Sequence, residues 1–439
     1  MPYETSSNSL SRRSLLGMGA GIGTGALLGG LSGCAGERPW NGRLRVLAWD
    51  FQPDTIRQLV ADWSAAGNLP TDVAVLPSLG YGPALQTRLR GGDVPNVFYN
   101  YSYNSQKFVQ EDWALGLADR PGIDDLLDAL YPSARSRHVT ADGKVVSVPY
   151  YSALHALIYN AQKVRQAGFT GPPTSLSETF DQCQALKNGG QAAPYVSYWV
   201  KEYCEEFLMR YLLNEEVTPF DEHGAPVFAD DRRSTEVLAW WLAMYRDGMT
   251  PKSILNDDPG KSAAMMAQGS ASFFALHHYF LSSVRSLTGP EVENIELAIG
   301  APQTLQIGEV LQLGSVENPE AQRGSWDLMR YYSWTDSEGR YRVPAQWAKA
   351  AGLVAPYPGF FKDPDVRAAL PEYYDLTLLD RALESASEVV PTRCAPWYPG
   401  FQAKAGDLIH GMLLGDNDPA ETVAALADAA VDTKKSGGL

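Results

Sequence analysis

The sequence predicts an α/β fold built from alternating strands and helices. Residues 44–49 form a short, apolar run that is typical of a buried strand. Residues 54–65 then place four apolar side chains, among them Trp63, at the i, i+3, i+4 and i+7 spacing of one helical face. Glycine and proline separate these segments, and the alternation continues along the chain. We therefore expect a mostly parallel sheet covered by helices, with a ligand bound at the carboxyl ends of its strands.

The remaining elements follow from the same periodicities. Further strands are expected at residues 73–76, 96–100, 145–148, 155–159 and 271–275. Helices are expected after Pro83, near Gln106, and at residues 177–187, 201–213, 234–246 and 262–268. The strands at 145–148 and 155–159 are expected to cross toward a second lobe.

The N-terminal segment predicts export followed by attachment to a lipid. Arg12 and Arg13 precede a weakly apolar run rich in glycine, alanine and leucine, which resembles a twin-arginine signal. The Leu-Ser-Gly-Cys sequence ending at Cys34 matches the lipobox of bacterial lipoproteins, in which the cysteine is acylated and the preceding residues are removed. We predict a signal peptide at residues 1–33 and a lipidated tether at 34–43. The glycine-rich run is short and poorly apolar for a membrane-spanning helix.

Lipidation would place the protein at a membrane face outside the cytoplasm. Acyl chains contribute about 0.8 kcal/mol per buried methylene, so a diacylated Cys34 would anchor the chain stably. Removing Arg12, Arg13 and Glu4 with the signal peptide changes the formal charge from −15 to −16. This acidity disfavours nucleic acid and anionic headgroups as partners. With no second run of 18 apolar residues, we expect a soluble body.

Three cysteines remain after lipidation: Cys183, Cys204 and Cys394. None has the CxxC spacing of a zinc or redox site. Cys183 and Cys204 could form a disulfide outside the cytoplasm, closing a loop of ~20 residues worth about 3 kcal/mol. Two buried thiols are an equally good interpretation, and the sequence leaves both open.

Motifs for cofactor or metal chemistry are incomplete. The GKS triplet at residues 260–262 lacks the first glycine of a phosphate loop, and the glycines at 80 and 82 lack the third glycine of a dinucleotide fingerprint. GxSxG and HExxH do not occur. His277 and His278 are neighbours on an expected strand and should point to opposite faces, so they are a poor pair for one metal ion. We expect no cofactor, no metal and no catalytic residue.

One enzyme hypothesis remains open. Glu202, Glu205 and Glu206 lie on one expected helix, and two carboxylates across a cleft are the machinery of a glycoside hydrolase. Carboxylates on helices are more often simply solvated. A lipid-anchored glycoside hydrolase or lyase is therefore the alternative hypothesis.

Aromatic residues gather at the ends of the expected strands. Flat rings match the apolar faces of sugars, and each stacked ring adds ~0.5–1.5 kcal/mol by analogy with aromatic pairs. The aromatic candidates are Trp49, Tyr81, Tyr99, Tyr101, Tyr103, Tyr150, Tyr151, Trp199, Tyr279, Trp397 and Tyr398. The polar candidates for binding hydroxyl groups are Asp50, Asn100, Ser152, Glu202, His278 and Glu309. Some of these rings should prove to be core residues.

Several short motifs, in order along the chain, resemble the extracellular solute-binding proteins of ABC importers. Residues 92–98 (GDVPNVF) are similar to the G-x-x-P-D-v block of that family, with Asn96 in place of the usual aspartate. The most specific match is the segment from DGK at 142–144 through VPYY at 148–151 to LIYN at 157–160. Later matches lie at residues 268–273, 317–329 and 415–421. The branch concerned is the sugar-binding one, similar to maltose-binding protein.

The resemblance implies a two-lobed clamshell of the periplasmic-binding-protein type (type II), with a sugar in the cleft at the hinge. It divides the chain into lobe 1 (residues 44–150 and 304–365) and lobe 2 (151–303 and 366–439). It implies capture of a mono- or oligosaccharide, without catalysis, for delivery to a membrane permease. By position, the family's binding loops correspond to Trp49, Asp50, Tyr99 to Tyr101, Tyr151, Ser152, Tyr198, Trp199, Glu202, Tyr279, Trp397 and Tyr398.

Three further expectations follow from these motifs. Ala153 stands where maltose-binding protein has a ligand-contacting carboxylate, which disfavours maltose as the ligand. Trp397, in a proline-bounded turn, is the first candidate for a ring that stacks on the sugar. We also expect a monomer that closes about three crossing segments, near residues 150–152, near 300–303 and before Pro371.

Overall fold

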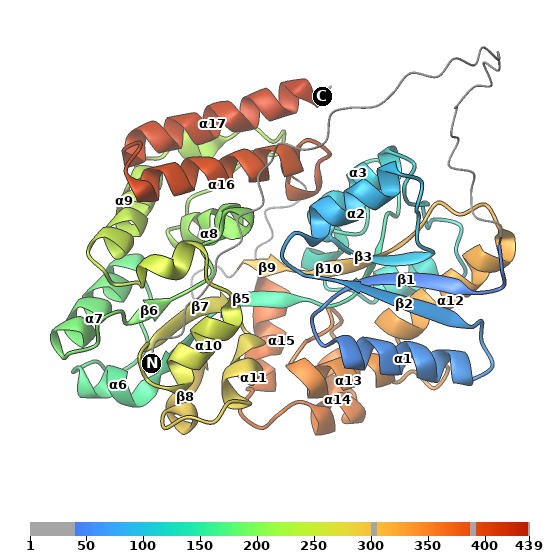
Figure 1. The fold of residues 1–439 in the computed structure, drawn as a ribbon, viewed down its shortest axis with the longest axis horizontal. Coiled ribbons are helices and arrows are strands. Elements are labelled where there is room, and N and C mark those ends of the chain that lie inside the picture. The colour runs from blue at the N-terminus through green and yellow to red at the C-terminus, as the bar shows by residue number, and fades with distance from the viewer. Residues whose placement is uncertain (1–39, 300–304, 387–391, 438–439) are drawn as a thin grey trace, which may run out of the picture. The chain divides into compact units, whose positions relative to one another are not determined.

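Two β-sheets organise the part of the chain that the computed structural model describes, residues 40–299, 305–386 and 392–437 (Figure 1). These residues belong to one unit, Arg38–Leu439. The signal peptide, the lipidation site Cys34 and the crossing expected near residues 300–303 lie outside the described residues. No helix of the described part is long and apolar enough to cross a membrane.

The first sheet has the strand order β2-β1-β3-β10-β4. Its strands are β1 (Leu44–Trp49), β2 (Thr71–Leu76), β3 (Val97–Tyr101), β4 (Val148–Pro149) and β10 (Glu309–Leu313). β1 is parallel to β2 and β3, whereas β10 is antiparallel to β3 and β4. The expected parallel arrangement is therefore right for β1 to β3 and wrong for the rest of the sheet. β10 returns from the second sheet and so enters the first one from the opposite end.

Helices pack on both faces of the first sheet (Figure 1). α1 buries Ile56, Leu59, Val60 and Trp63, the apolar face that the sequence predicts, and contacts β2 and α12. The helices on this side are α1 (Pro53–Ala65), α2 (Tyr81–Arg90), α3 (Ser105–Gln110), α4 (Ile123–Asp128), α5 (Pro132–Arg135), α12 (Pro319–Ser333), α13 (Arg342–Ala351), α14 (Pro364–Ala369) and α15 (Leu376–Ser385).

The second sheet has the strand order β6-β7-β5-β8, and β9 pairs with the start of β5. Its strands are β5 (Ala153–Asn160), β6 (Tyr195–Val196), β7 (Phe273–His277), β8 (Ile295–Ala298) and β9 (Gln306–Ile307). β5 is buried along its whole length and is antiparallel to both β7 and β8. This sheet also departs from the parallel arrangement expected from the sequence.

Among the helices of the second sheet, α16 and α17 pack against each other and against α8 and α9. α16 contacts α8 and α17, and α17 contacts α9. The helices are α6 (Ala161–Gln166), α7 (Leu176–Asn188), α8 (Lys201–Asn214), α9 (Arg232–Arg246), α10 (Pro259–Ala267), α11 (Phe280–Arg285), α16 (Tyr398–Leu414) and α17 (Pro419–Ser436). Asp258 caps α10, so the GKS triplet opens a helix and is not a phosphate loop.

Cys183 on α7 and Cys204 on α8 are both buried free thiols. Of the two alternatives that the sequence leaves open, the structure shows the thiols. Burial raises the pKa of both thiol groups, which makes them poor nucleophiles.

The chain passes from the first sheet to the second between Pro149, the end of β4, and Ala153, the start of β5. This passage is where the sequence predicts one. The described return passage is at Gly308, which separates β9 from β10. Ser152 ties these segments to a third one, because its N–H donates to the carbonyl oxygen of Val354 at 2.7 Å.

The last passage between the two sides lies further along the chain than expected. α15 still packs on α5, where the Tyr131 hydroxyl group bonds Asp380 and the Ser133 hydroxyl group donates to the Leu383 carbonyl group at 3.1 Å. α16 packs on α8. The chain therefore changes sides after Ser385 and not before Pro371. The residue limits of the two lobes remain a prediction.

Gly308 is the position in this passage that tolerates no side chain. A Cβ atom there would lie 2.0 Å from Nη1 of Arg137 and 2.7 Å from the Tyr151 carbonyl oxygen. We predict that Gly308→Ala lowers the free energy of unfolding by about 1–3 kcal/mol, the usual cost of overpacking. Urea denaturation measures the change. Gly171→Ala is the control, because a Cβ atom there meets nothing within 4 Å. Equal stability of both variants would contradict the prediction.

Candidate functional site

A cavity of about 250 Å³ lies where strand ends of the two sheets meet. The first sheet supplies the last residues of β1 and β3 and the first residue of β10. The second sheet supplies the end of β7 and the residues after it. The lining residues are Trp49, Phe51, Ser78, Tyr101, Tyr151, Tyr198, Tyr203, Pro259, Gly260, Leu276, His277, Tyr279, Phe280 and Glu309.

A second cavity, of about 210 Å³, adjoins the first and shares Ser78, Tyr101 and Tyr203 with it. Glu202 and Gln402 add polar groups to its wall. Because the same rings border both cavities, the two can serve as neighbouring subsites of one elongated binding site.

The aromatic rings that line these cavities pack on one another. Trp49 and Tyr101 stack with ring centroids 5.5 Å apart and an interplanar angle of 25°, and Tyr101 stacks on Tyr103 at 5.2 Å and 3°. Tyr279 meets Tyr151 edge-on at 5.8 Å, with an interplanar angle of 89°. Such packed rings keep fixed orientations, which a flat ligand needs for stacking.

The structure brings many of the predicted ligand-binding residues to this place. Trp49, Tyr101, Tyr151, Tyr198, Tyr279 and Glu309 line the first cavity. Tyr81 and Glu202 line the second cavity. Their contacts with a ligand remain a proposal.

Three predicted polar residues have other roles. The carboxylate of Asp50 accepts hydrogen bonds from the backbone N–H and the hydroxyl group of Ser78, at 2.8 and 2.5 Å, and so holds Ser78 at the cavity. The Asn100 side chain is buried and donates to Gln312. The Ser152 hydroxyl group accepts hydrogen bonds from Arg137 and Gln306 at the passage between the sheets. These three side chains are already engaged inside the protein.

Three more predictions are corrected by burial. The Tyr99 hydroxyl group donates to that of Tyr332 beneath the first sheet. Trp199 is fully buried, and its indole N–H donates to the hydroxyl group of Tyr211. His278 is buried as well, and its Nδ1 accepts the backbone N–H of Leu154. None of these three residues lines either cavity.

Trp397 and Tyr398 are also core residues. Only 6 % of Trp397 is exposed, and its ring meets Phe220 edge-on at 6.2 Å. The Tyr398 hydroxyl group donates to Glu205 at 2.5 Å. The first candidate for a stacking ring is therefore wrong, because Phe220 occupies the space beside it. Trp397 is not among the described residues that line either cavity.

Some lining residues were not predicted. Phe51 and Ser78 each follow a parallel strand by two residues, so the rule that ligands bind at the carboxyl ends of strands would have found them. Tyr203 adjoins the predicted Glu202 on α8. His277 is buried and belongs to the site through β7, for which the sequence holds no comparable signal.

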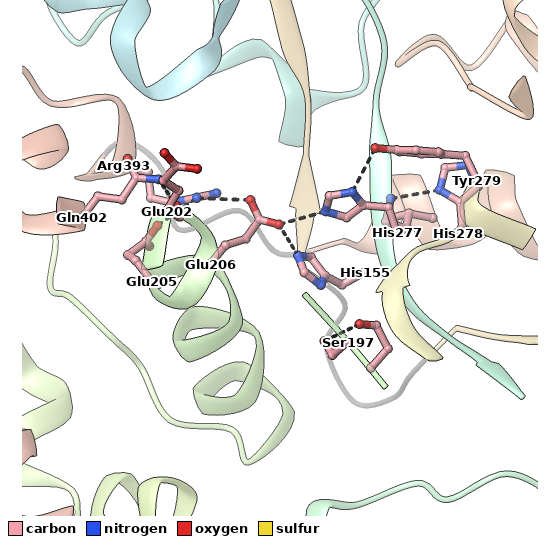
Figure 2. Close-up of polar contacts among 12 residues, drawn as sticks. His155, Ser197, Glu202, Glu205, Glu206, His277, His278, Tyr279, Arg393 and Gln402 are labelled. Atoms are coloured by element: carbon pink, nitrogen blue, oxygen red, sulfur yellow. Dashed lines mark hydrogen bonds and ion pairs between the residues drawn. The ribbon is translucent and has the colours of Figure 1, made fainter. Parts of the chain in front are cut away.

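A group of buried ionisable side chains adjoins the first cavity, since His277 belongs to both; their contacts are drawn in Figure 2. Glu205 accepts a hydrogen bond from the Arg393 guanidinium group at 3.0 Å. Glu206 accepts from Nε2 of His155 and from Nε2 of His277, both at 2.8 Å on the same oxygen atom, Oε1. Of the three helix carboxylates that suggested an enzyme, only Glu202 therefore faces a cavity.

The pKa values of these groups follow from burial and pairing. Burial lowers the pKa of His155 to about 3, so its imidazole is neutral. Burial opposes the charged form of Glu206, but the hydrogen bonds from His155 and His277 outweigh it and hold the pKa of Glu206 well below its ordinary value. Burial raises the pKa of Glu309 well above its ordinary value, and the neighbouring Glu206 adds to this shift. Glu309 is thus disposed to donate a hydrogen bond.

Comparison with known proteins shows a widespread fold. No protein-family model matches the chain, and no curated protein sequence is similar to it. Among solved structures, maltose-bound MalE3 of T. maritima aligns with a TM-score of 0.78 and 16% identity, covering 89% of this chain and 99% of that one. An ABC transporter solute-binding protein of Thermotoga lettingae, bound with α-D-tagatose, aligns with a TM-score of 0.76 and 15% identity, covering 89% and 99%.

A third structure extends the range of ligands. The GacH receptor of Streptomyces glaucescens, solved unliganded and with acarbose, aligns with a TM-score of 0.74 and 17% identity, covering 89% of this chain and 98% of that one. The chain thus has the α/β fold of ABC sugar-binding proteins over most of its length, as the sequence motifs predict.

The raised pKa of Glu309 predicts a specific dependence of stability on pH. The unfolded chain releases this proton near the ordinary glutamate pKa of about 4.3, whereas the folded chain keeps it to higher pH. Above that pH the folded state holds more protons than the unfolded state. The free energy of unfolding of the wild type therefore falls by up to about 1.4 kcal/mol per pH unit until the pKa of the folded state is reached. Glu309→Gln removes this loss.

The measurement is urea denaturation at pH 5 and pH 8. Glu309→Gln should gain stability relative to the wild type as the pH rises. Glu111→Gln, at an exposed carboxylate, is the control and should follow the wild type. A constant difference between Glu309→Gln and the wild type at both pH values would contradict the prediction.

Proposed function

We propose that this protein is the substrate-binding component of an ABC importer and that it captures a carbohydrate. The observation that carries the proposal is the aromatic cavity bounded by strand ends of both sheets. Among the described residues that line it there is no lysine or arginine. Solved proteins of the same fold bind maltose, tagatose and acarbose, which supports a neutral, hydroxyl-rich ligand.

The chemistry of the cavity fits a sugar. Tyr101 and Trp49 line the cavity and offer apolar ring surface to the C–H face of a pyranose ring. Around them, tyrosine hydroxyl groups, Ser78, His277 and Glu309 supply donors and acceptors for hydroxyl groups. This combination of apolar surface with a few placed polar groups is typical of small-molecule sites.

Capture is proposed to proceed by closure of the two lobes about the passages at Ser152 and Gly308. A ligand shifts this equilibrium only by its higher affinity for the closed form, so it must touch both sides. Trp49, Tyr101 and Glu309 belong to the first sheet, and Tyr279 follows the last residue of β7 in the second sheet. A sugar in the cavity would therefore touch both sides. The closed form would then present its surface to a membrane permease.

The alternative, a glycoside hydrolase, requires a second carboxylate at the same cavity. Glu309 is the only carboxylate among the described residues of the first cavity, Glu202 lines the adjoining cavity instead, and Glu205 and Glu206 are engaged behind the first one. We therefore propose binding without catalysis. Incubation with the bound sugar should return it unchanged.

The test is a glycan library screened by thermal shift. A true ligand at a hundredfold excess over its Kd stabilises the protein by about 2.7 kcal/mol. With that ligand, we predict that Tyr101→Ala weakens binding about ten- to a hundredfold, because it removes a stacking face shared by both cavities. Isothermal titration calorimetry measures the affinity.

Trp397→Ala is the matched control for this prediction. It should lower the free energy of unfolding by ~3–5 kcal/mol as a core truncation and leave the affinity unchanged. The opposite pattern, with affinity lost at Trp397 and kept at Tyr101, would reject the proposed site. If the library contains no ligand at all, the carbohydrate proposal fails.

We further propose that the mature protein begins at Cys34 and is held by its acylated thiol at the outer face of the cell membrane, after export by a twin-arginine signal. The support is the lipobox at residues 31–34 and the arginine pair before it. An anchored, monomeric binding protein stays close to its permease, which suits capture outside the cytoplasm.

We predict that Cys34→Ala moves the protein from the membrane fraction to the medium or periplasm, because it removes the acyl chains that provide anchoring. Membrane fractionation followed by immunoblotting measures the distribution. Cys394→Ala is the control and should remain with the membrane. Retention of Cys34→Ala on membranes that have been washed with high salt would rule out the lipid anchor.

A further inference from the structure

His155, Glu206 and His277 converge behind the first cavity in an arrangement that the proposed sugar binding does not use. His155 and His277 are directly opposite each other on the antiparallel strands β5 and β7. Opposite residues of such a pair have side chains on the same face of the sheet. Glu206 reaches them from α8, so three separate elements supply the group (Figure 2).

The ligand atoms of these residues are close together. Nε2 of each histidine lies 2.8 Å from Oε1 of Glu206, and one ligand atom from each residue fits within a span of 4.8 Å. Zinc binds imidazole nitrogen at about 2.0–2.1 Å and carboxylate oxygen at about 2.0–2.2 Å, which places tetrahedral ligand atoms roughly 3.3–3.5 Å apart. To surround an ion, each nitrogen must therefore move away from Oε1, and atoms as far apart as 4.8 Å must move closer together. All three residues are buried.

We propose that His155, Glu206 and His277 form a binding site for a divalent transition-metal ion, with zinc as the best fit. Two imidazoles and one carboxylate are a ligand set found in zinc proteins, and they leave a fourth position for water or a ligand hydroxyl group. The imidazole nitrogens disfavour magnesium and calcium, which prefer oxygen ligands. His277 also lines the first cavity, which provides a route for the ion.

The surrounding groups are compatible with a bound cation. Arg393 lies 3.0 Å from Glu205 and 3.7 Å from Glu206, so one guanidinium group serves two buried carboxylates. A divalent ion would take the place of the two imidazole hydrogen bonds as the partner of the buried Glu206 carboxylate. The Tyr279 hydroxyl group lies 3.1 Å from Nδ1 of His277 and can accept a hydrogen bond from Nδ1–H in the metal-bound state, as outer partners of zinc ligands do.

Binding would change which nitrogen of each imidazole carries the proton. In the metal-free form each imidazole donates its Nε2–H to Glu206. In the metal-bound form the same proton sits on Nδ1, and Nε2 coordinates the ion. Nδ1 of His155 has no hydrogen-bond partner among the described residues, and this holds for either tautomer.

The test uses the full chain expressed without a polyhistidine tag and treated with EDTA. Competition with a chromophoric chelator should show one zinc ion bound per chain. Glu206→Gln keeps the size of the side chain and an oxygen acceptor but removes the charge. It should weaken zinc binding at least about a hundredfold, more than the loss of an outer partner does. His277→Gln should do the same.

His138→Gln is the matched control, since His138 is a buried histidine bonded to Ser147 outside the group. Its zinc affinity should equal that of the wild type. X-ray absorption of the zinc-loaded wild type should show two imidazole ligands, and this readout stands even if a variant fails to fold. No zinc binding, an absorption spectrum without imidazole, or full affinity in a folded Glu206→Gln would overturn the proposal. Sugar affinity of the metal-free protein is measured separately, so failure of the metal site and failure of sugar binding are distinguishable.

Discussion

The close passage of two chain segments between the sheets is the constraint on which the rest of the structure depends. Ser152 and Gly308 meet there, with the Arg137 side chain filling the space that a side chain at residue 308 would need. Tyr151 and Glu309, the immediate neighbours of these two residues, line the cavity. The residues proposed as the hinge and the residues proposed to contact the ligand are therefore covalently adjacent. A substitution at the passage should therefore change the geometry of the cavity, and a substitution at the cavity should change the geometry of the passage.

The second constraint is the charge behind the aromatic wall. Glu205, Glu206 and Arg393 are all buried, and an unpaired charge there would cost several kcal/mol. Each carboxylate accordingly has donors: Glu205 has Arg393 and Tyr398, and Glu206 has two imidazoles. These bonds fix α8 against α16 and against the second sheet, and they hold the first turn of α8 at the cavities.

Local patterns predicted the local structure. β1 and the apolar face of α1 follow from residues that are neighbours in the sequence, and the strand-end rule found Trp49 and Tyr101. The motifs predicted the fold because they report the order of elements. The antiparallel β10 was missed, because its direction depends on the passage at Gly308 and not on the composition of the strand.

The errors at the site have one physical cause. A large ring at a strand end or in a turn can face either a ligand or another ring. Which of the two it faces depends on packing partners that are distant in the sequence. Trp397 packs on Phe220, and Trp199 bonds Tyr211 within a buried cluster. The pairing of His155 with His277 is equally invisible from the spacing of histidines, because it arises from strand register. The neighbouring His278 faces Leu154 instead, as expected for alternate residues.

His277 joins the two sites proposed for this protein. It lines the aromatic cavity and contacts Glu206 behind it, so a metal ion on its Nε2 would alter the wall that a sugar meets. If the fourth position of the ion accepts a sugar hydroxyl group, the two ligands stabilise each other, and the factor by which zinc strengthens sugar binding must equal the factor by which sugar strengthens zinc binding. If water alone occupies that position, only the change in the cavity wall couples the two affinities, and the factor is smaller. Titration of each ligand in the presence and absence of the other distinguishes these cases, and it does so without any substitution in the protein.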